Sequence, residues 1–168
     1  HTVVGNAEKV IKDNKDYDAR AEIMWSGTLA HNNLIGSGRE ADWASHGIEH
    51  ELSAMYNIAH GAGLAIVYPA WMKYVYKEDV DRFALFANKV FGIEINENDK
   101  EETALKGIKA LEDFYTRIGI PYKLSEVGIT DEHFEEMAFK ATFENTRTLG
   151  AFKKLNKNDV VNIYKLAL

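Results

Sequence analysis

Hydrophobic side chains recur at helical spacing along nearly the whole chain, and this periodicity limits the fold more than any other feature. Apolar residues at i, i+3, i+4 and i+7 face one side of an α-helix, whereas a half-buried strand alternates apolar and polar residues. No convincing alternation is present. The clearest helical stripes are Phe134, Met137, Ala138, Ala141 and Val160, Ile163, Tyr164, Ala167. We therefore predict an all-α, multi-helix fold.

Cap and stop residues place several helix ends. Asp16 or Asp18 can cap a helix whose apolar stripe is Ala21, Met24, Trp25 and Thr28. That helix should end by the glycine-rich segment 36–38. Pro69 is expected to kink or stop a later helix, because proline lacks one helical donor. Thr130 can cap a helix near the carboxyl end. No repeat or long linker divides the chain, so residues 1–168 are predicted to form one helical domain.

Composition excludes several classes of protein. The 168 residues include no cysteine, which rules out disulfides, cysteine zinc sites and cysteine nucleophiles. A net charge of −6, without a basic patch, argues against nucleic-acid binding. No apolar run reaches the ~20 residues of a membrane-spanning helix, and no signal peptide is visible. A cytoplasmic location is expected.

Three of the six histidines lie between residues 46 and 60. His46 and His50 are four residues apart, so a helix would place them one turn apart, where two imidazoles can bind one metal ion. His60 would lie ~21 Å from His46 along an unbroken helix. A shared metal therefore requires a bend, and Asn57 and Gly61 are residues that favour one. The alternative is that these histidines are packed or surface side chains.

Other site patterns are incomplete. The zincin motif begins at His50-Glu51, but Ala54 stands where its second histidine should be. No histidine has a glutamate three residues before it, as a di-iron bundle would need. Neither a nucleophile elbow nor a phosphate-binding glycine loop is present.

The segment "DWASHGIEHELSAMYNIAHGAGLAIVYPAWM" resembles the C-terminal signature of iron-containing (group III) alcohol dehydrogenases, and most closely their butanol dehydrogenase-like branch. The resemblance continues through "DYDARAEIMWSGTLAHNNLIG" before it and "GIPYKLSEVGI" and "LGAFKKLNKNDVVNIYKLAL" after it. It thus covers nearly the whole chain.

This resemblance implies the C-terminal helical domain of the dehydroquinate synthase-like, iron-containing alcohol dehydrogenase fold. In that family Fe2+ or Zn2+ lies between this domain and an N-terminal α/β domain that binds NAD or NADP. By the resemblance, His46 and His60 are metal ligands and His50 transfers protons beside the nicotinamide and substrate. The implied reaction interconverts primary alcohols and aldehydes, such as butanol and butanal. The full-length protein is expected to be a homodimer.

The chain departs from the family pattern because the remaining two ligands, an Asp and a His, are absent, as is the cofactor domain. We therefore expect a C-terminal fragment that binds metal weakly and is inactive alone. His31 and His133 are expected to be surface or capping residues. The tryptophans Trp25, Trp43 and Trp71 are expected in the core. The alternative for Trp43, which lies one turn before His46, is that it lines a substrate pocket. The alternative function is a non-catalytic helical module for assembly or partner binding, with structural histidines.

Overall fold

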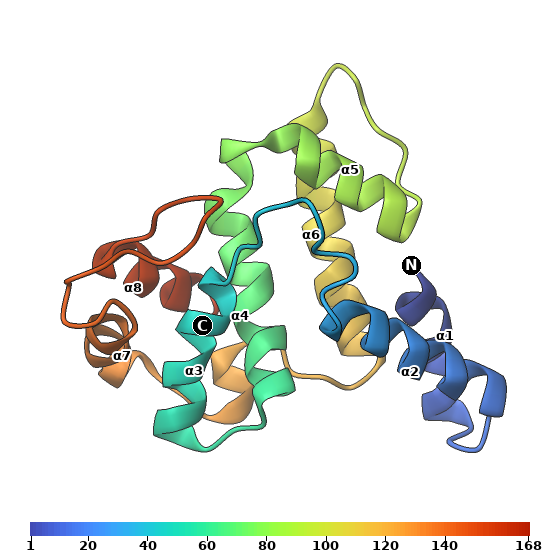
Figure 1. The fold of residues 1–168 in the computed structure, drawn as a ribbon, viewed down its shortest axis with the longest axis horizontal. Helices are drawn as coiled ribbons and strands as arrows, with labels where there is room; N and C mark the ends of the chain where they lie inside the picture. The colour runs from blue at the N-terminus through green and yellow to red at the C-terminus, as the bar shows by residue number, and fades with distance from the viewer.

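The chain forms eight α-helices in the computed structural model, which describes residues 1–168 (Figure 1). Three short 3-10 helices are η1 (Tyr76–Glu78), η2 (Leu124–Val127) and η3 (Asp131–His133). The α-helices are α1 (Thr2–Lys12), α2 (Tyr17–His31), α3 (Ala44–Tyr56), α4 (His60–Val75), α5 (Val80–Phe91), α6 (Lys100–Arg117), α7 (Phe134–Ala141) and α8 (Lys157–Leu166). The only strand-like pairing is one isolated bridge between Leu149 and Leu155. The predicted all-α fold is confirmed.

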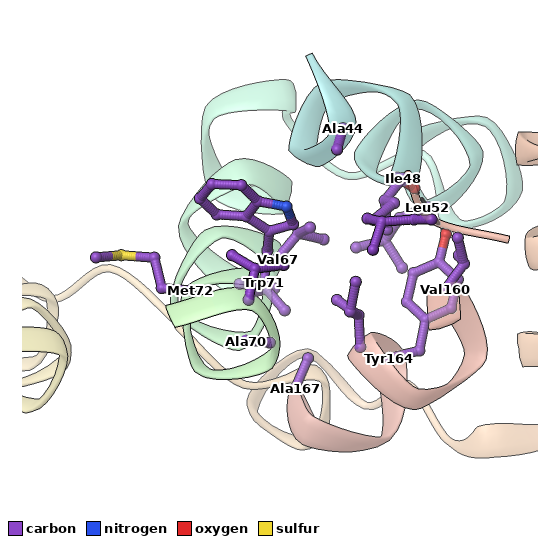
Figure 2. Packing of buried hydrophobic residues seen from close by; sticks show 14 of the residues in the cluster. Ala44, Ile48, Leu52, Val67, Ala70, Trp71, Met72, Val160, Tyr164 and Ala167 are labelled. Carbon is purple, nitrogen blue, oxygen red and sulfur yellow. Dashed lines mark hydrogen bonds between the residues drawn. The ribbon is translucent and has the colours of Figure 1, made fainter. Parts of the chain in front are cut away.

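Helix α4 connects the two halves of the molecule. It packs against α3 and α8 on one side and against α6 on another, while α5 pairs with α6 and α1 with α2 (Figure 1). Helices α7 and α8 lie at one end of the long axis, and α1 and α2 lie at the other. The hydrophobic core includes side chains from α3, α4 and α8 (Figure 2). This packing holds α3 and α4, which carry the histidine cluster, against each other.

The two stripes identified in the sequence form part of this core. All eight of their side chains are buried, including Phe134 and Tyr164, whose rings stack with centroids 5.3 Å apart. Tyr164 points from α8 toward α3, where its hydroxyl donates a hydrogen bond of 2.7 Å to the Ile48 carbonyl (Figure 2). Burial raises the pKa of Tyr164, so the hydroxyl remains protonated and can donate.

Replacing Tyr164 with phenylalanine should destabilise the protein by about 1 kcal/mol, the usual net value of one hydrogen bond. For a chain of this size that corresponds to a Tm lower by about 2–4 °C. Thermal unfolding measures the change. The control is Tyr17→Phe, because Tyr17 is 80% exposed and should leave Tm unchanged. Equal Tm values for the two variants would show that the buried bond contributes nothing.

The helix-end predictions are confirmed in part, and α2 ends at His31, before the glycine-rich segment 36–38. Asp16 caps α2 by accepting a hydrogen bond of 3.0 Å from the Ala19 amide. Of the two outcomes predicted for Pro69, a kink or a stop, the stop does not occur, because α4 continues to Val75. Pro69 is buried within a helix packed against α3, α6 and α8, and we attribute the continuation to that packing, which can outweigh one missing backbone bond. Thr130 precedes η3 and makes no side-chain cap.

The prediction for the tryptophans is correct only for Trp71, which is buried. Trp25 and Trp43 are both 62% exposed. The predicted apolar stripe of α2 is likewise exposed at Met24 and Trp25. The reason is that α2 packs mainly against α1, which buries no residue completely, so helical spacing alone did not identify a buried face there.

Candidate metal centre

A sharp turn between α3 and α4 brings the histidines together. Helix α3 ends at Tyr56, and Asn57 adopts the left-handed conformation with φ 51°. Asparagine tolerates that conformation better than most residues, so it ends the helix without glycine. Helix α4 then begins at His60. The predicted bend is confirmed, and the imidazole centroids of His46 and His60 lie 5.3 Å apart.

The three imidazoles form one cluster. One ring nitrogen from each of His46, His50 and His60 lies within 4.8 Å of the others. The His60 ring is 5.4 Å from His50, and the His46 and His50 rings are 6.3 Å apart. The two members of the His-x-x-x-His pair are thus farther from each other than either is from His60. The side chains do not point into separate packing sites, as structural histidines would.

An open cavity of about 680 Å³ surrounds these rings. It is lined by His31, Trp43, His46, Gly47, His50, His60, Arg147, Thr148, Leu149 and Gly150. Segment 147–150, which precedes α8, lines the same cavity as the histidines. A Cβ atom at Gly47 would lie 3.3 Å from the Leu149 side chain, so a small residue permits this close contact.

Asp42 holds the two walls of the cavity together. Its Oδ1 accepts a hydrogen bond of 2.8 Å from the Ala44 amide at the start of α3. Its Oδ2 accepts bonds of 2.7 Å from the amides of Ala151 and Phe152. Gly150 has φ +88°, and a Cβ there would lie 2.6 Å from the Lys153 carbonyl oxygen. Both residues therefore shape the segment that faces the histidines.

The electrostatics of the cavity suit a cation-binding imidazole cluster. Partial burial lowers the pKa of His46, and the neighbouring His60 and His50 lower it further. The neutral ring, which has a free lone pair, is thereby favoured. His60 Nδ1 donates to the Glu49 carboxylate, because a carboxylate can only accept. In the neutral form of the His60 ring, Nε2 is then the nitrogen with the free lone pair.

These residues fit a divalent metal ion. Imidazole nitrogen is a ligand for iron and zinc, and two such nitrogens on one ion lie within about 4 Å of each other. The nitrogens of the three histidines lie within 4.8 Å of one another, close to that spacing. A carboxylate that accepts from the other nitrogen of a ligand histidine is the usual arrangement behind metal-bound imidazoles. Three nitrogens alone would leave coordination positions open.

Some residues of the cavity were not found, or were misjudged, in the sequence. Trp43 contacts His46 edge-on with ring centroids 4.9 Å apart, although we predicted it in the core. Its spacing of three residues from His46 is a signal that it shares a helical face. Arg147 and Thr148 are about a hundred residues from the histidines, and no local pattern links them.

The other two histidines that the sequence placed at the surface differ in position. His31 is exposed and also lines the cavity. His133 lies outside the cavity and faces Glu136 at 3.6 Å, one helical turn away.

A model described as the Fe-containing alcohol dehydrogenase family, C-terminal, matches residues 1–168. The chain belongs to the iron-containing alcohol dehydrogenase family. A probable NADH-dependent butanol dehydrogenase of Bacillus subtilis is 41% identical over 167 residues, which are 99% of this chain and 43% of that protein. An NADPH-dependent aldehyde reductase of Escherichia coli is 33% identical, over 99% of this chain and 42% of that protein.

The fold agrees with solved structures of the family. The crystal structure of NADH-dependent butanol dehydrogenase A from Thermotoga maritima superimposes with a TM-score of 0.91 at 42% identity, over 99% of this chain and 43% of that chain. The present chain therefore corresponds to about two fifths of the length of these iron-containing alcohol dehydrogenases. None of its helices combines the length and the apolar character needed to cross a bilayer.

Proposed function

We propose that this chain supplies the helical, metal-binding part of a longer NAD(P)-linked alcohol dehydrogenase that interconverts primary alcohols and aldehydes. The single observation that carries the proposal is the convergence of three imidazoles from α3 and α4 in one open cavity. The named activities of the relatives support the reaction class, since they are butanol dehydrogenases and an aldehyde reductase. The missing length would provide the remaining ligands and the cofactor site.

We assign His46 and His60 as metal ligands and His50 as the proton relay. The short distance between the His46 and His60 rings supports the first assignment. His50 is exposed to the cavity beside both ligands, which supports the second. The runner-up pairing of His46 with His50 is less favoured, because their rings are the farthest apart of the three.

The residues of the cavity have different roles in the proposed reaction. A divalent ion held there would supply a Lewis acid for the alcohol or carbonyl oxygen, and a nicotinamide cofactor would accept or deliver the hydride. His50 takes up the hydroxyl proton when an alcohol is oxidised and returns it when an aldehyde is reduced, since imidazole exchanges protons readily near neutral pH. Trp43 and Leu149 are the apolar side chains of the lining and would contact a short alkyl chain.

The test is butanal reduction by the full-length protein with NADH and with NADPH, before and after metal removal. Chelation should abolish turnover, and adding Fe2+ (without oxygen) or Zn2+ to the stripped protein should restore it. The 168-residue chain alone is expected to show no turnover. Full activity after complete metal removal, verified by elemental analysis, would refute the proposal.

The alternative function, a non-catalytic helical module, predicts structural histidines packed in separate places. The clustered rings argue against it. The homodimer and the cytoplasmic location stay predictions, and the imidazole ligands suit either Fe2+ or Zn2+.

A further inference from the structure

Glu49 is a fully buried acidic side chain in the middle of the histidine cluster. It follows the first turn of α3, between His46 and His50, and has no solvent exposure. Removing a carboxylate from water is strongly unfavourable unless other groups bind it. A buried charge at this position therefore needs an explanation beyond packing.

Both oxygens of the Glu49 carboxylate accept hydrogen bonds from named donors. The Ser53 hydroxyl, one helical turn later, donates to Oε1, and His60 Nδ1 donates to Oε2. The Ser53 hydroxyl also lies 3.3 Å from the Ile58 carbonyl oxygen in the turn before α4. The carboxylate thus joins α3 to the first residue of α4.

The backbone around Glu49 leaves space for this carboxylate. A Cβ atom at Gly63 would lie 2.3 Å from Glu49 Oε1, 2.8 Å from Cγ and 2.9 Å from Cδ. Those distances are far below van der Waals contact, so any larger residue would displace the carboxylate. Gly63 and Glu49 are consequently a matched pair in the α3–α4 interface.

The bond to Glu49 determines which nitrogen of His60 can bind an ion. A carboxylate oxygen is only an acceptor, so in the neutral imidazole that binds a metal Nδ1 carries the proton and Nε2 has the free lone pair. The bond also restricts the rotation of a ring whose side chain is otherwise 49% exposed. Without the carboxylate, His60 could exchange tautomers and rotate away from His46.

We propose that Glu49 is a positioning residue that fixes the tautomer and the ring orientation of His60 and thereby sets the metal affinity of the site. This inference rests on the proposed function. Groups in this relation to a ligand histidine typically change metal affinity by 10–100-fold. Glu49→Ala should therefore weaken Zn2+ binding by about 100-fold and Glu49→Gln by about 10-fold, because glutamine keeps an acceptor oxygen without the charge.

The experiment is a Zn2+ titration of the full-length protein against a competing chelator, with the visible spectrum of the Co2+ form as a second measurement. A spectrum that changes in Glu49→Ala and returns toward the original in Glu49→Gln would indicate a reoriented ligand, which simple destabilisation would not produce. Ser53→Ala removes the other donor to Glu49 and should weaken binding less than Glu49→Ala does. Ser53→Ala also tests the proposal if Glu49→Ala fails to fold.

Glu112→Gln is the matched control. Glu112 is also buried and pairs with Lys73 at 2.5 Å, but Lys73 is thirteen residues along α4 from His60, about 20 Å away. The zinc affinity and the Co2+ spectrum of the Glu112→Gln variant should equal those of the unchanged protein. Two results would overturn this inference while leaving the proposed function intact. One is a zinc affinity that is the same in the unchanged protein and in all Glu49 and Ser53 variants. The other is a zinc affinity that Glu112→Gln lowers as much as the Glu49 variants do. No zinc binding by the unchanged protein would overturn the proposed function as well.

Discussion

Replacing His60 with alanine in the full-length protein is expected to remove tight metal binding and to lower kcat/KM for butanal by more than about 1,000-fold, or ~4 kcal/mol of transition-state stabilisation. His60 begins α4 and lies between His46 and His50, so its loss opens the centre of the cluster. A substitution behind a ligand typically costs 10–100-fold in affinity, and losing the ligand itself should cost more.

Metal content by elemental analysis and butanal reduction measure this effect. His133→Ala is the control, because that histidine lies outside the cavity and its imidazole faces Glu136. It should retain both metal and activity. Stoichiometric metal in His60→Ala would exclude His60 as a ligand. The metal ligands would then be His46 and His50.

Replacing His50 with alanine should give a different result, in which the metal is retained and kcat falls by about 100–1,000-fold. That range is typical for the loss of one positioned proton-transfer group. His50 is exposed to an open cavity, so added imidazole can reach the vacated space and should restore part of kcat.

The rescue by imidazole separates proton transfer from metal binding. The control is the same imidazole series on His60→Ala, where missing metal rather than a missing relay should limit turnover. Loss of metal from His50→Ala would instead make His50 a ligand. An unchanged kcat with the metal in place would remove His50 from the mechanism.

Much of the fold could be predicted because helix periodicity is a local property. The stripes that contain Phe134 and Tyr164 are buried as predicted, and Asp16 caps α2. The bend at Asn57 was predicted from a distance argument, because His46 and His60 would lie ~21 Å apart on an unbroken helix and could not bind the same ion. The sequence did not show that α4 would continue past Pro69 or that Trp25 would be exposed, because both depend on how many neighbouring helices cover the residue.

Some residues of the candidate site could be predicted from the sequence and others could not. His46, His50 and His60 were found because they lie within fifteen residues of one another. Glu49 lay in the same segment, yet nothing in its spacing showed that it would be buried against Gly63. Trp43 was misjudged because a large aromatic residue is usually packed, whereas here it borders a cavity.

The sequence by itself determined the all-α character, most helix ends and the identity of the histidine cluster, because these follow from interactions among residues a few positions apart. Only the tertiary structure decided which helix faces are buried, that Glu49 bonds His60, and that Asp42 brings the segment around Arg147 to face the histidines. Those contacts join residues from 11 to 110 positions apart. They form only when α3, α4 and the segment before α8 pack together, and no local periodicity records that packing.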